Sequence, residues 1–515
     1  MEEKTKKSKN SVVIISAVVV AILVIWAVIS AVSFNAAANA SFNVLTGDFG
    51  WLYCIAVAAF LFWCLYVAFS KYGKIRLGPD DSKPEYSTGS WFAMLFSAGM
   101  GIGLVFYGVA EPLDMFTAPI DVAAGSPEAA LWAIKESYLH WCLHPWACFC
   151  VIGLGLAYMQ FRKGKPGLIS SLFIPLIGEE RAKGWLGKLI DIFAIIATVL
   201  GVCTSLGLGT LQINSGLNFL FGVPQTPLVE CIIVVVFTFL FTAAAVSGIE
   251  KGINFVATLN MWLVGAIIII AFIVGPTVTD LKTLSEAIGT YFQFIIQDSF
   301  MDGAFKNASF HANWTVFFWA WWIAWGPFVG TFIARISKGR TIREFIIAVL
   351  IVPSLLTFVW FAVLGPMGIQ LGLAKATEAA VSTPLAAFKV FSYYPLGGLL
   401  SIILLFLVCT FFVTSADSAV LVLGIFSEHG TLNPTKKVQL LWGCLEGVLA
   451  IVLMVSSENA LTMMQTISIV GAFPFVFVEL GAMFGITKGL KLEFSPTSGQ
   501  EIMAKMKNEA NTQNA

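Results

Sequence analysis

Long apolar stretches alternate with short polar stretches along almost the whole chain of 515 residues. Each apolar stretch is about 20 residues long, which is the length that an α-helix needs to cross the hydrocarbon core of a bilayer. We count twelve such stretches and therefore predict twelve transmembrane helices. Their approximate bounds are 12–32, 51–69, 91–110, 138–158, 190–211, 228–246, 255–273, 315–334, 345–364, 399–426, 438–455 and 463–483.

Three segments need a choice between alternatives. The stretch 12–32 precedes an A-x-A-like site at 36–40, as a cleaved signal peptide would. Its apolar part is longer than the roughly 7 to 15 residues of a signal core, so we predict an uncleaved first span. The connections 277–310 and 368–394 mix apolar and charged residues, which predicts helices that lie at the membrane surface.

The basic residues predict how the chain is oriented. Loops rich in Lys and Arg stay on the cytoplasmic side of a membrane. With the N-terminus placed there, all but five of the 30 Lys and Arg fall in cytoplasmic segments. The exceptions are Lys135, Lys282, Lys306, Lys375 and Lys389. We therefore expect a multi-pass protein of a bacterial cell (inner) membrane with both termini in the cytoplasm.

The composition also argues against several functions. The 30 Lys and Arg balance 30 Asp and Glu, so no bulk field attracts nucleic acid. The nine Cys form no CxxC pair, which disfavours a disulfide framework or a zinc site. His140 and His144 are the one close histidine pair, and the nearest acid along the chain is Glu136, so we expect structural histidines and no enzyme.

The segment 98–108, AGMGIGLVFYG, contains glycines at alternate positions, Gly99, Gly101 and Gly103. Each costs roughly 1 kcal/mol in a helix interior relative to Ala. Gly99 and Gly103 have the GxxxG spacing of helix packing, but packing does not need Gly101. We predict that the helix unwinds there and exposes backbone N–H groups to a carboxylate and carbonyl groups to an ion.

Tryptophans are concentrated in the eighth stretch, which contains WTVFFWAWWIAWGPF. Trp322 and Trp325 are spaced i,i+3, and Trp321 and Trp325 are spaced i,i+4, so each pair shares a helix face. Converging indoles offer negative π faces to a quaternary ammonium, which cannot donate hydrogen bonds. Helix packing is the simpler alternative for this spacing.

The same stretch contains Gly326-Pro327, where we predict a second interrupted helix. If the first two spans stand apart, the remaining ten form two halves of five, and both weak points fall in the first helix of a half. Interruptions at matching places are typical of the central site of an inverted-repeat transporter.

The tenth stretch contains TSADS, with Thr414, Ser415, Asp417 and Ser418. These side chains are too polar for lipid and should face the interior of the bundle. Hydroxyl and freed carbonyl oxygens suit a small hard ion such as Na⁺. Interhelical hydrogen bonds are the alternative explanation.

Four segments together resemble the betaine/choline/carnitine transporter family. They are AGMGIGLVFYGVAEP (98–112), HWCLHPW (140–146), WAWWIAWGPFVGTFIARISKGRTIREF (319–345) and TSADS (414–418), and the similarity extends from about 50 to 485. The resemblance implies an all-α membrane protein with a LeuT-like 5+5 inverted repeat preceded by two extra helices, assembled as a homotrimer in the lipid bilayer. The corresponding parts are a tail at 1–11, two peripheral helices and a loop at 12–88, repeats at 89–276 and 312–486, a connector at 277–311 and a tail at 487–515.

The resemblance also implies the site residues. An aromatic box would consist of Trp141, Trp146, Phe149, Trp322 and Trp325, with Trp321 and Phe317 nearby and substrate against Gly99, Gly101 and Gly103; Phe149 stands where Tyr is expected. Sodium would bind the backbone carbonyls of Ser97, Met100 and Phe411 and the side-chain oxygens of Thr414 and Ser415. A second sodium site would involve Thr198 and Phe328, although Val202 stands where another hydroxyl is expected. Glu446 in the eleventh stretch receives no role.

The substrate prediction depends on Gly103. Choline carriers of the family tend to carry an acid at this position, and an acid would repel the carboxylate of a betaine. No Lys or Arg occurs in 189–250 or 390–435 to replace a coupling cation. We therefore predict a sodium-coupled symporter, without a resident cofactor, that takes up glycine betaine or a similar zwitterion as osmolyte or nutrient. The alternatives are a proton-coupled or exchange carrier for choline, carnitine or dimethylsulfoniopropionate, and a betaine-gated channel or sensor.

Overall fold

The computed structural model describes residues 11–99, 101–247, 250–457 and 459–494. Helices make up nearly all of these residues, and an isolated bridge joins Arg76 to Thr341. A helix satisfies its backbone hydrogen bonds internally, which is what a lipid environment requires. The predicted all-α class is confirmed for the described part of the chain.

Eleven helices in the described residues are long and apolar enough to cross a membrane. They match eleven of the twelve predicted stretches. They are α2 (Ser11–Ile29), α4 (Gly50–Phe69), α7 with α8 (Pro127–Trp141 and Leu143–Ala157), α11 (Trp185–Phe221), α12 (Pro227–Ser247), α13 (Glu250–Val274), α16 (Phe317–Arg335), α17 (Ile342–Ile369), α20 (Gly397–Ser427), α21 (Lys436–Val455) and α22 (Ala460–Leu492). The remaining stretch is divided between α5 (Thr88–Gly99) and α6 (Ile102–Thr117).

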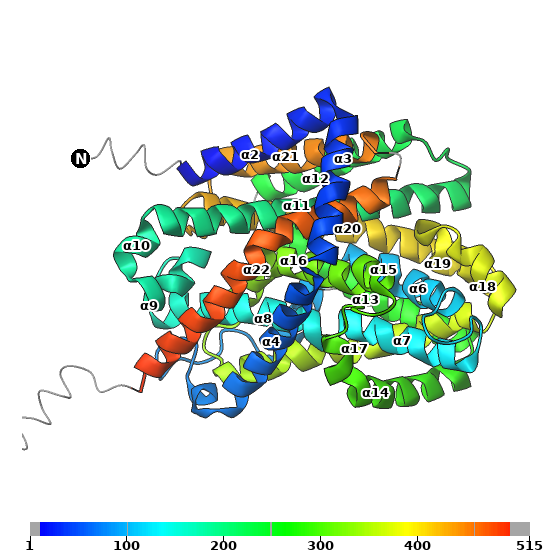
Figure 1. Ribbon diagram of the computed structural model, residues 1–515, viewed down its shortest axis with the longest axis horizontal. Coiled ribbons are helices and arrows are strands. Elements are labelled where there is room, and N and C mark those ends of the chain that lie inside the picture. Colours follow the sequence, from blue (N-terminus) through cyan, green and yellow to red (C-terminus); the bar gives the residue numbers. More distant parts are fainter. Residues whose placement is uncertain (1–10, 100, 248–249, 458, 495–515) are drawn as a thin grey trace, which may run out of the picture.

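Further helices connect these elements. The longest are α3 (Ala31–Gly47), which follows α2 after Ser30, and α14 (Thr277–Ser299), at the lower edge of the bundle in Figure 1. The others are α9 (Ile174–Ile177), α10 (Glu179–Lys183), α15 (Ala308–His311), α18 (Leu373–Ala380) and α19 (Ala386–Phe391). The segments 277–310 and 368–394 are therefore helical, as predicted.

The core is built around the pairing of α8 with α16, which lie together at the centre of the bundle (Figure 1). Their backbones approach closely at Gly153 and Gly330. A Cβ added to Gly153 would lie 3.2 Å from the Gly330 carbonyl oxygen, and one added to Gly330 would lie 2.9 Å from the Gly153 nitrogen. Small residues allow this contact, as is common between membrane helices.

The helix contacts follow a reciprocal pattern between 88–274 and 317–492. The contact of α8 with α16 has a counterpart in α17 with α6, and that of α11 with α22 has one in α13 with α20. The fourth long helix of each half, α12 and α21, pack against each other. Corresponding helices of the two halves thus have corresponding neighbours.

Two helix interruptions among the described residues lie within the segments of the predicted site, and only the first of them was predicted. Between α5 and α6, Gly101 is extended, with φ −132° and ψ −157°, so the predicted interruption is confirmed. A second interruption at Cys142 separates α7 from α8. It precedes Pro145, which lies in the first turn of α8, where its missing N–H leaves no helical bond unmade.

The predicted interruption at Gly326-Pro327 is wrong, because α16 continues through both residues to Arg335. A proline within a helix removes one backbone hydrogen bond and favours a kink. Here α16 packs against α8, α11 and α22, and these contacts hold the helix. Packing outweighs the local preference.

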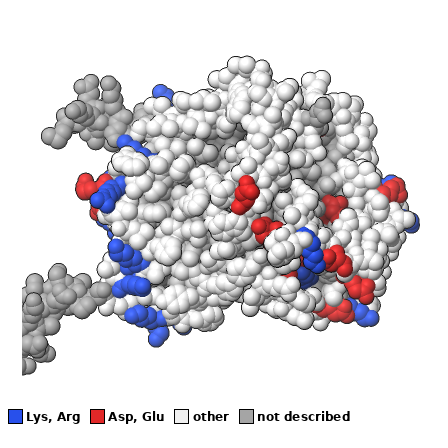
Figure 2. Space-filling view, in the orientation of Figure 1, with Lys and Arg blue, Asp and Glu red and all other residues white. Residues whose placement is uncertain are grey.

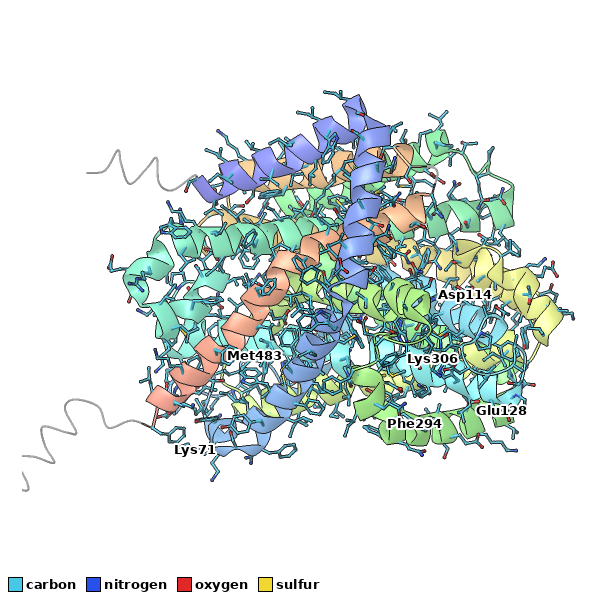
Figure 3. The ribbon with its side chains drawn as sticks, viewed as in Figure 1. Lys71, Asp114, Glu128, Phe294, Lys306 and Met483 are labelled. Atoms are coloured by element: carbon cyan, nitrogen blue, oxygen red, sulfur yellow. The ribbon has the colours of Figure 1, made fainter. Side chains whose placement is uncertain are left out.

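Charge is distributed unevenly between the two ends of the bundle. Figure 2 shows Lys and Arg gathered at its left end, where Figure 1 places α9, α10 and the last turn of α22. Lys71 lies toward this end in Figure 3, whereas Asp114, Glu128 and Lys306 lie toward the other. The first described turn of α2 is also at the basic end.

An ion-pair cluster joins three segments at the basic end. Arg162 binds Asp80 at 2.7 Å and Glu493 at 2.9 Å, and Lys163 also pairs with Glu493. Partial burial raises the pKa of Glu493, but hydrogen bonds from Arg162 and Lys163 outweigh it and lower the pKa to about 2. The end of α22 is therefore fixed to the end of α8 over the whole physiological pH range.

Candidate functional site

Several indole rings lie together where α16 meets α7, α8 and α11. We call Trp141, Trp146, Phe149, Trp321, Trp322 and Trp325 the aromatic cluster; each is at most 5% exposed. Trp322 is its hub, with ring centroids 4.8 Å from Trp321 and 4.9 Å from Trp141. It also contacts Phe149 at 6.1 Å and Trp325 at 6.4 Å. Trp322 therefore contacts four of the other five members of the cluster.

The remaining members are linked through neighbours. Trp146 contacts Phe149, with centroids 5.6 Å apart, and Phe317 stacks on Trp321 at 5.5 Å. Gly103 lies directly against the cluster, since an added Cβ would be 2.5 Å from Trp321 Cη2 and 3.0 Å from Trp141 Cη2. Only glycine fits here without displacing a ring.

Four indole N–H groups of the cluster have protein acceptors. Trp141 Nε1 donates to Glu111 Oε2 at 2.6 Å, and Trp322 Nε1 donates to the His140 carbonyl at 2.9 Å. Trp325 and Trp321 both donate to the Gly201 carbonyl, at 3.1 and 3.4 Å. Because these donors are used within the protein, they are not available to a ligand.

The interruption at Cys142 supplies one of these acceptors. In a continuous helix the His140 carbonyl would accept from the N–H four residues later. The chain leaves the helical path at Cys142, with φ −96° and ψ −115°. The His140 carbonyl is thus able to accept from Trp322.

A second group of oxygen atoms lies on α20, beside the interruption between α5 and α6. A Cβ added to Gly101 would lie 3.3 Å from Ser415 Oγ and 3.6 Å from Trp325 Cη2. Gly101 therefore separates the aromatic cluster from the α20 hydroxyl groups by one residue of backbone. Asp417 is buried, as predicted for an interior-facing side chain, whereas Thr414, Ser415 and Ser418 are half-buried.

Thr414 is linked to a residue that the sequence did not identify. Asn260 Nδ2 on α13 donates to Thr414 Oγ1 at 3.4 Å. Asn260 is 1% exposed, and its Oδ1 has no hydrogen-bond partner within the described part of the chain. Phe411 lies one turn before Thr414 on the same helix and is buried.

The other predicted cation ligands are less closely connected. Met100 lies outside the described residues, while Ser97 and Gly99 lie in the last turn of α5. Thr198 is buried on α11, and its hydroxyl donates to the Ala194 carbonyl at 2.8 Å. Phe328 on α16 contacts the Trp325 ring at 5.5 Å.

Comparison of the sequence with models of known protein families identifies the family of this chain. A family model described as BCCT, betaine/carnitine/choline family transporter, matches residues 11–495. The chain belongs to this family. It is therefore a multi-pass membrane transporter of the betaine/choline/carnitine type and not an enzyme.

The relatives of this transporter are bacterial proteins. It is 44% identical to the glycine betaine transporter OpuD of Bacillus subtilis, over 95% of each chain. It is 41% identical to glycine betaine transporter 1 of Vibrio parahaemolyticus, over 87% of each chain. The ectoine/hydroxyectoine transporter of Virgibacillus pantothenticus is 39% identical, over 93% of this chain and 96% of the relative.

One buried polar group beside the aromatic cluster of this transporter was not among the predicted site residues. Glu111 on α6 is fully buried and accepts a hydrogen bond from Trp141, and its second carboxyl oxygen lies 2.8 Å from His140 Nδ1. It lies about 30 positions before them, so helical spacing gives no indication of the contact. The available signal was an acid directly after the apolar stretch 91–110, which marks a functional candidate if the helix continues through it.

Two further acids and one groove lie outside the cluster. Glu446 on α21 and Glu479 on α22 are fully buried, and neither carboxylate has a hydrogen-bond partner among the described residues. A groove of about 410 Å³ between α12 and α21 is lined mainly by apolar side chains, including Val235, Phe239, Leu440 and Ile451. It shares no residue with the aromatic cluster, so we do not assign the substrate to it.

Proposed function

We propose that this transporter is a symporter that couples the entry of sodium to the uptake of glycine betaine or a similar zwitterion, as osmolyte or nutrient. The observation that carries the proposal is the position of Gly101, with Trp325 on one side and Ser415 on the other. A cation site made of rings and an ion site made of oxygens would then share one segment of unwound backbone. The binding of one ligand could then change the affinity for the other through this unwound backbone.

The two ends of a betaine find different partners in this arrangement. The trimethylammonium group would lie among the π faces of Trp141, Trp146, Trp322 and Trp325, where cation–π attraction replaces hydration. The carboxylate would lie at the start of α6, whose first N–H groups have no acceptor within the helix. Phe149 contributes a π face but no hydroxyl.

The sodium ion would bind at the same interruption, held by the carbonyls of Ser97, Met100 and Phe411 and the hydroxyls of Thr414 and Ser415. Hydroxyl and carbonyl oxygens are suitable ligands for a hard cation. We propose a second sodium at Thr198 and Phe328 only as a subsidiary site, since the Thr198 hydroxyl already donates to a backbone carbonyl.

The proposal includes the architecture around the site. Twelve spans form a 5+5 inverted repeat, 89–276 and 312–486, after two peripheral helices, and three copies assemble in the cell (inner) membrane. The reciprocal helix contacts support the repeat, and the basic end near α9, α10 and the end of α22 supports cytoplasmic termini.

Uptake driven by an imposed gradient tests the coupling directly. In proteoliposomes, an inward sodium gradient should drive accumulation of radiolabelled glycine betaine above the external concentration. An equal potassium gradient is the control and should give only equilibration. Equal accumulation with both salts would contradict sodium coupling, and equilibration with both would indicate a channel.

The alternatives differ in their substrate and in their driving ion. A proton-coupled or exchange carrier for choline, carnitine or dimethylsulfoniopropionate would share this fold. Since one relative is named an ectoine/hydroxyectoine transporter, ectoine belongs in the same comparison. Competition of each compound against glycine betaine, with and without a proton gradient, separates these functions.

Gly103 provides a test of zwitterion selectivity. We expect Gly103→Asp to reduce glycine betaine uptake and to raise the ratio of choline to betaine uptake about tenfold, because the new carboxylate repels the one on betaine. Any side chain here must displace Trp321 and Trp141, so overall activity will fall as well. Gly103→Asn is the matched control, with the same size and no charge. A ratio that rises equally in both variants would refute the electrostatic explanation.

A further inference from the structure

Glu111 is the one acid that contacts the aromatic cluster within the described residues. Its side chain comes from α6 and is fully buried. Oε2 accepts from Trp141 Nε1 at 2.6 Å, and Oε1 lies 2.8 Å from His140 Nδ1. Both carboxylate oxygens are thus engaged by adjacent residues at the end of α7, where the helix is interrupted.

The surrounding hydrogen bonds accommodate a carboxylate at this position. His140 Nε2 lies 3.3 Å from Thr315 Oγ1. With its proton on Nδ1, a neutral imidazole donates to the Glu111 carboxylate and accepts from the Thr315 hydroxyl; with its proton on Nε2, it donates to Thr315 and accepts from a protonated Glu111. Trp141 can only donate, and either form of Glu111 offers it an acceptor oxygen. In the first arrangement, to which our inference applies, the carboxylate has no cationic hydrogen-bond partner among the described residues.

The other charges nearby are already paired. Lys135 lies more than one helical turn before His140 and binds Glu136 at 2.5 Å and Asp298 at 2.7 Å. Asp114 lies one turn beyond Glu111 on α6, toward the less basic end of the bundle (Figure 3). None of these three acids forms a hydrogen bond to an indole of the cluster within the described part of the chain. Glu111 therefore has a distinct relation to the rings.

An anion that accepts from an indole N–H acts on the ring in two ways. It fixes the orientation of the ring, since charge-assisted hydrogen bonds are short and strong. It also makes the π face more negative, because electron density shifts from the N–H bond into the ring. Cation–π attraction depends on that negative face. In a site of low dielectric, the charge behind the ring attracts a cation as well.

We propose that Glu111 is a specificity-determining positioning residue. Acting through Trp141, it strengthens the preference of the aromatic cluster for a positively charged ligand over a neutral ligand of the same shape. The inference rests on the proposed function, because it assumes that the cluster binds the trimethylammonium group. It adds a residue that does not touch the substrate.

The test compares two ligands that differ in one atom. Glycine betaine carries a trimethylammonium group, and 3,3-dimethylbutanoate has a neutral carbon in place of its nitrogen. The ratio of their inhibition constants against labelled betaine uptake measures the preference for charge. Glu111→Gln has the same shape and no charge, and His140 can change its tautomer to satisfy the amide. We expect this ratio to fall about tenfold, with little change for 3,3-dimethylbutanoate.

Two further variants sharpen the test. Glu136→Gln is the matched control, since it neutralises a buried acid on α7 that does not contact Trp141; its ratio should stay at the wild-type value. Glu111→Met removes the charge without introducing an unpaired amide, and should lower the ratio as Glu111→Gln does. Gel filtration of the purified variants shows which of them are folded. The ratio of inhibition constants is then measured on the folded variants.

The outcomes separate the inference from the function on which it rests. If Glu111→Gln weakens both ligands equally, or neither, Glu111 has only a structural role and the inference is overturned. An equal fall of the ratio in Glu136→Gln would overturn it too, because a general loss of negative charge would then suffice. A wild-type protein without preference for betaine over 3,3-dimethylbutanoate, which lacks the positive charge, would instead contradict the proposed function.

Discussion

Replacement of Trp325 by alanine is expected to weaken the apparent affinity for glycine betaine by about 30-fold or more. A desolvated cation–π contact is worth about 2 kcal/mol or more, which corresponds to that factor. The ring of Trp325 contacts Trp321, Trp322 and Phe328, so its removal also loosens the cluster. Initial rates of uptake over a range of betaine concentrations, at saturating sodium, measure the effect.

Two further variants show whether the loss of betaine affinity in Trp325→Ala is caused by the loss of its π face. Trp325→Phe retains a π face but loses the N–H that donates to the Gly201 carbonyl at 3.1 Å, so we expect an intermediate affinity. Trp442→Ala removes another buried indole, on α21, which donates to Ser427. It should lower stability without changing the affinity. A wild-type affinity in Trp325→Ala would exclude this residue from the substrate site.

The aromatic cluster shows what helical spacing can predict. The i,i+3 and i,i+4 intervals among Trp321, Trp322 and Trp325 are local, and the structure confirms that these rings contact one another. The groups that accept hydrogen bonds from these rings and from Trp141 are distant from them in the sequence. Gly201 and Glu111 reach them because α11 packs on α16 and α6 packs on α7. Nothing in the spacing along the chain encodes those contacts.

The helix interruptions show the same limit. The glycines around Gly101 weaken a helix intrinsically, and the predicted interruption is present. Gly326-Pro327 is also weak, yet α16 continues through it, packed against its neighbouring helices. At Cys142 the interruption precedes Pro145 in the first turn of α8, a proline that the sequence analysis did not use. Local propensity predicts where a helix can break, and packing determines where it does.

The α20 hydroxyls illustrate a prediction that the sequence justified only in part. Polar residues in an apolar stretch predicted an interior face, and Asp417 is buried as expected. Their nearness to Gly101 could not be deduced, because it depends on how α20 crosses the interruption between α5 and α6. The same is true of Asn260, which reaches Thr414 from α13. The resemblance to the family implied a shared site for Ser97 and Ser415 but gave no indication of Asn260.

Replacement of Thr414 by valine is expected to raise the sodium concentration for half-maximal uptake about tenfold or more, because it removes one oxygen ligand at constant volume. Thr414→Ser is the matched control, since it keeps the hydroxyl, and should stay near the wild-type value. Thr410→Val removes a hydroxyl one turn earlier, which donates to the Phe406 and Leu407 carbonyls, and should also leave the sodium dependence unchanged. Equal sodium dependence in Thr414→Val and the wild type would exclude Thr414 as a ligand.

The position of Gly101 between the two proposed sites leads to a second expectation for Thr414→Val, which concerns the coupling between sodium binding and betaine binding. If sodium and betaine share this backbone, sodium must strengthen betaine binding by the same factor by which betaine strengthens sodium binding, because coupling free energies are reciprocal. Betaine affinity measured by tryptophan fluorescence, with and without sodium, gives one factor, and sodium affinity with and without betaine gives the other. In Thr414→Val both factors should fall together toward one. A loss of sodium binding that leaves betaine coupling intact would mean that the coupling ion binds elsewhere.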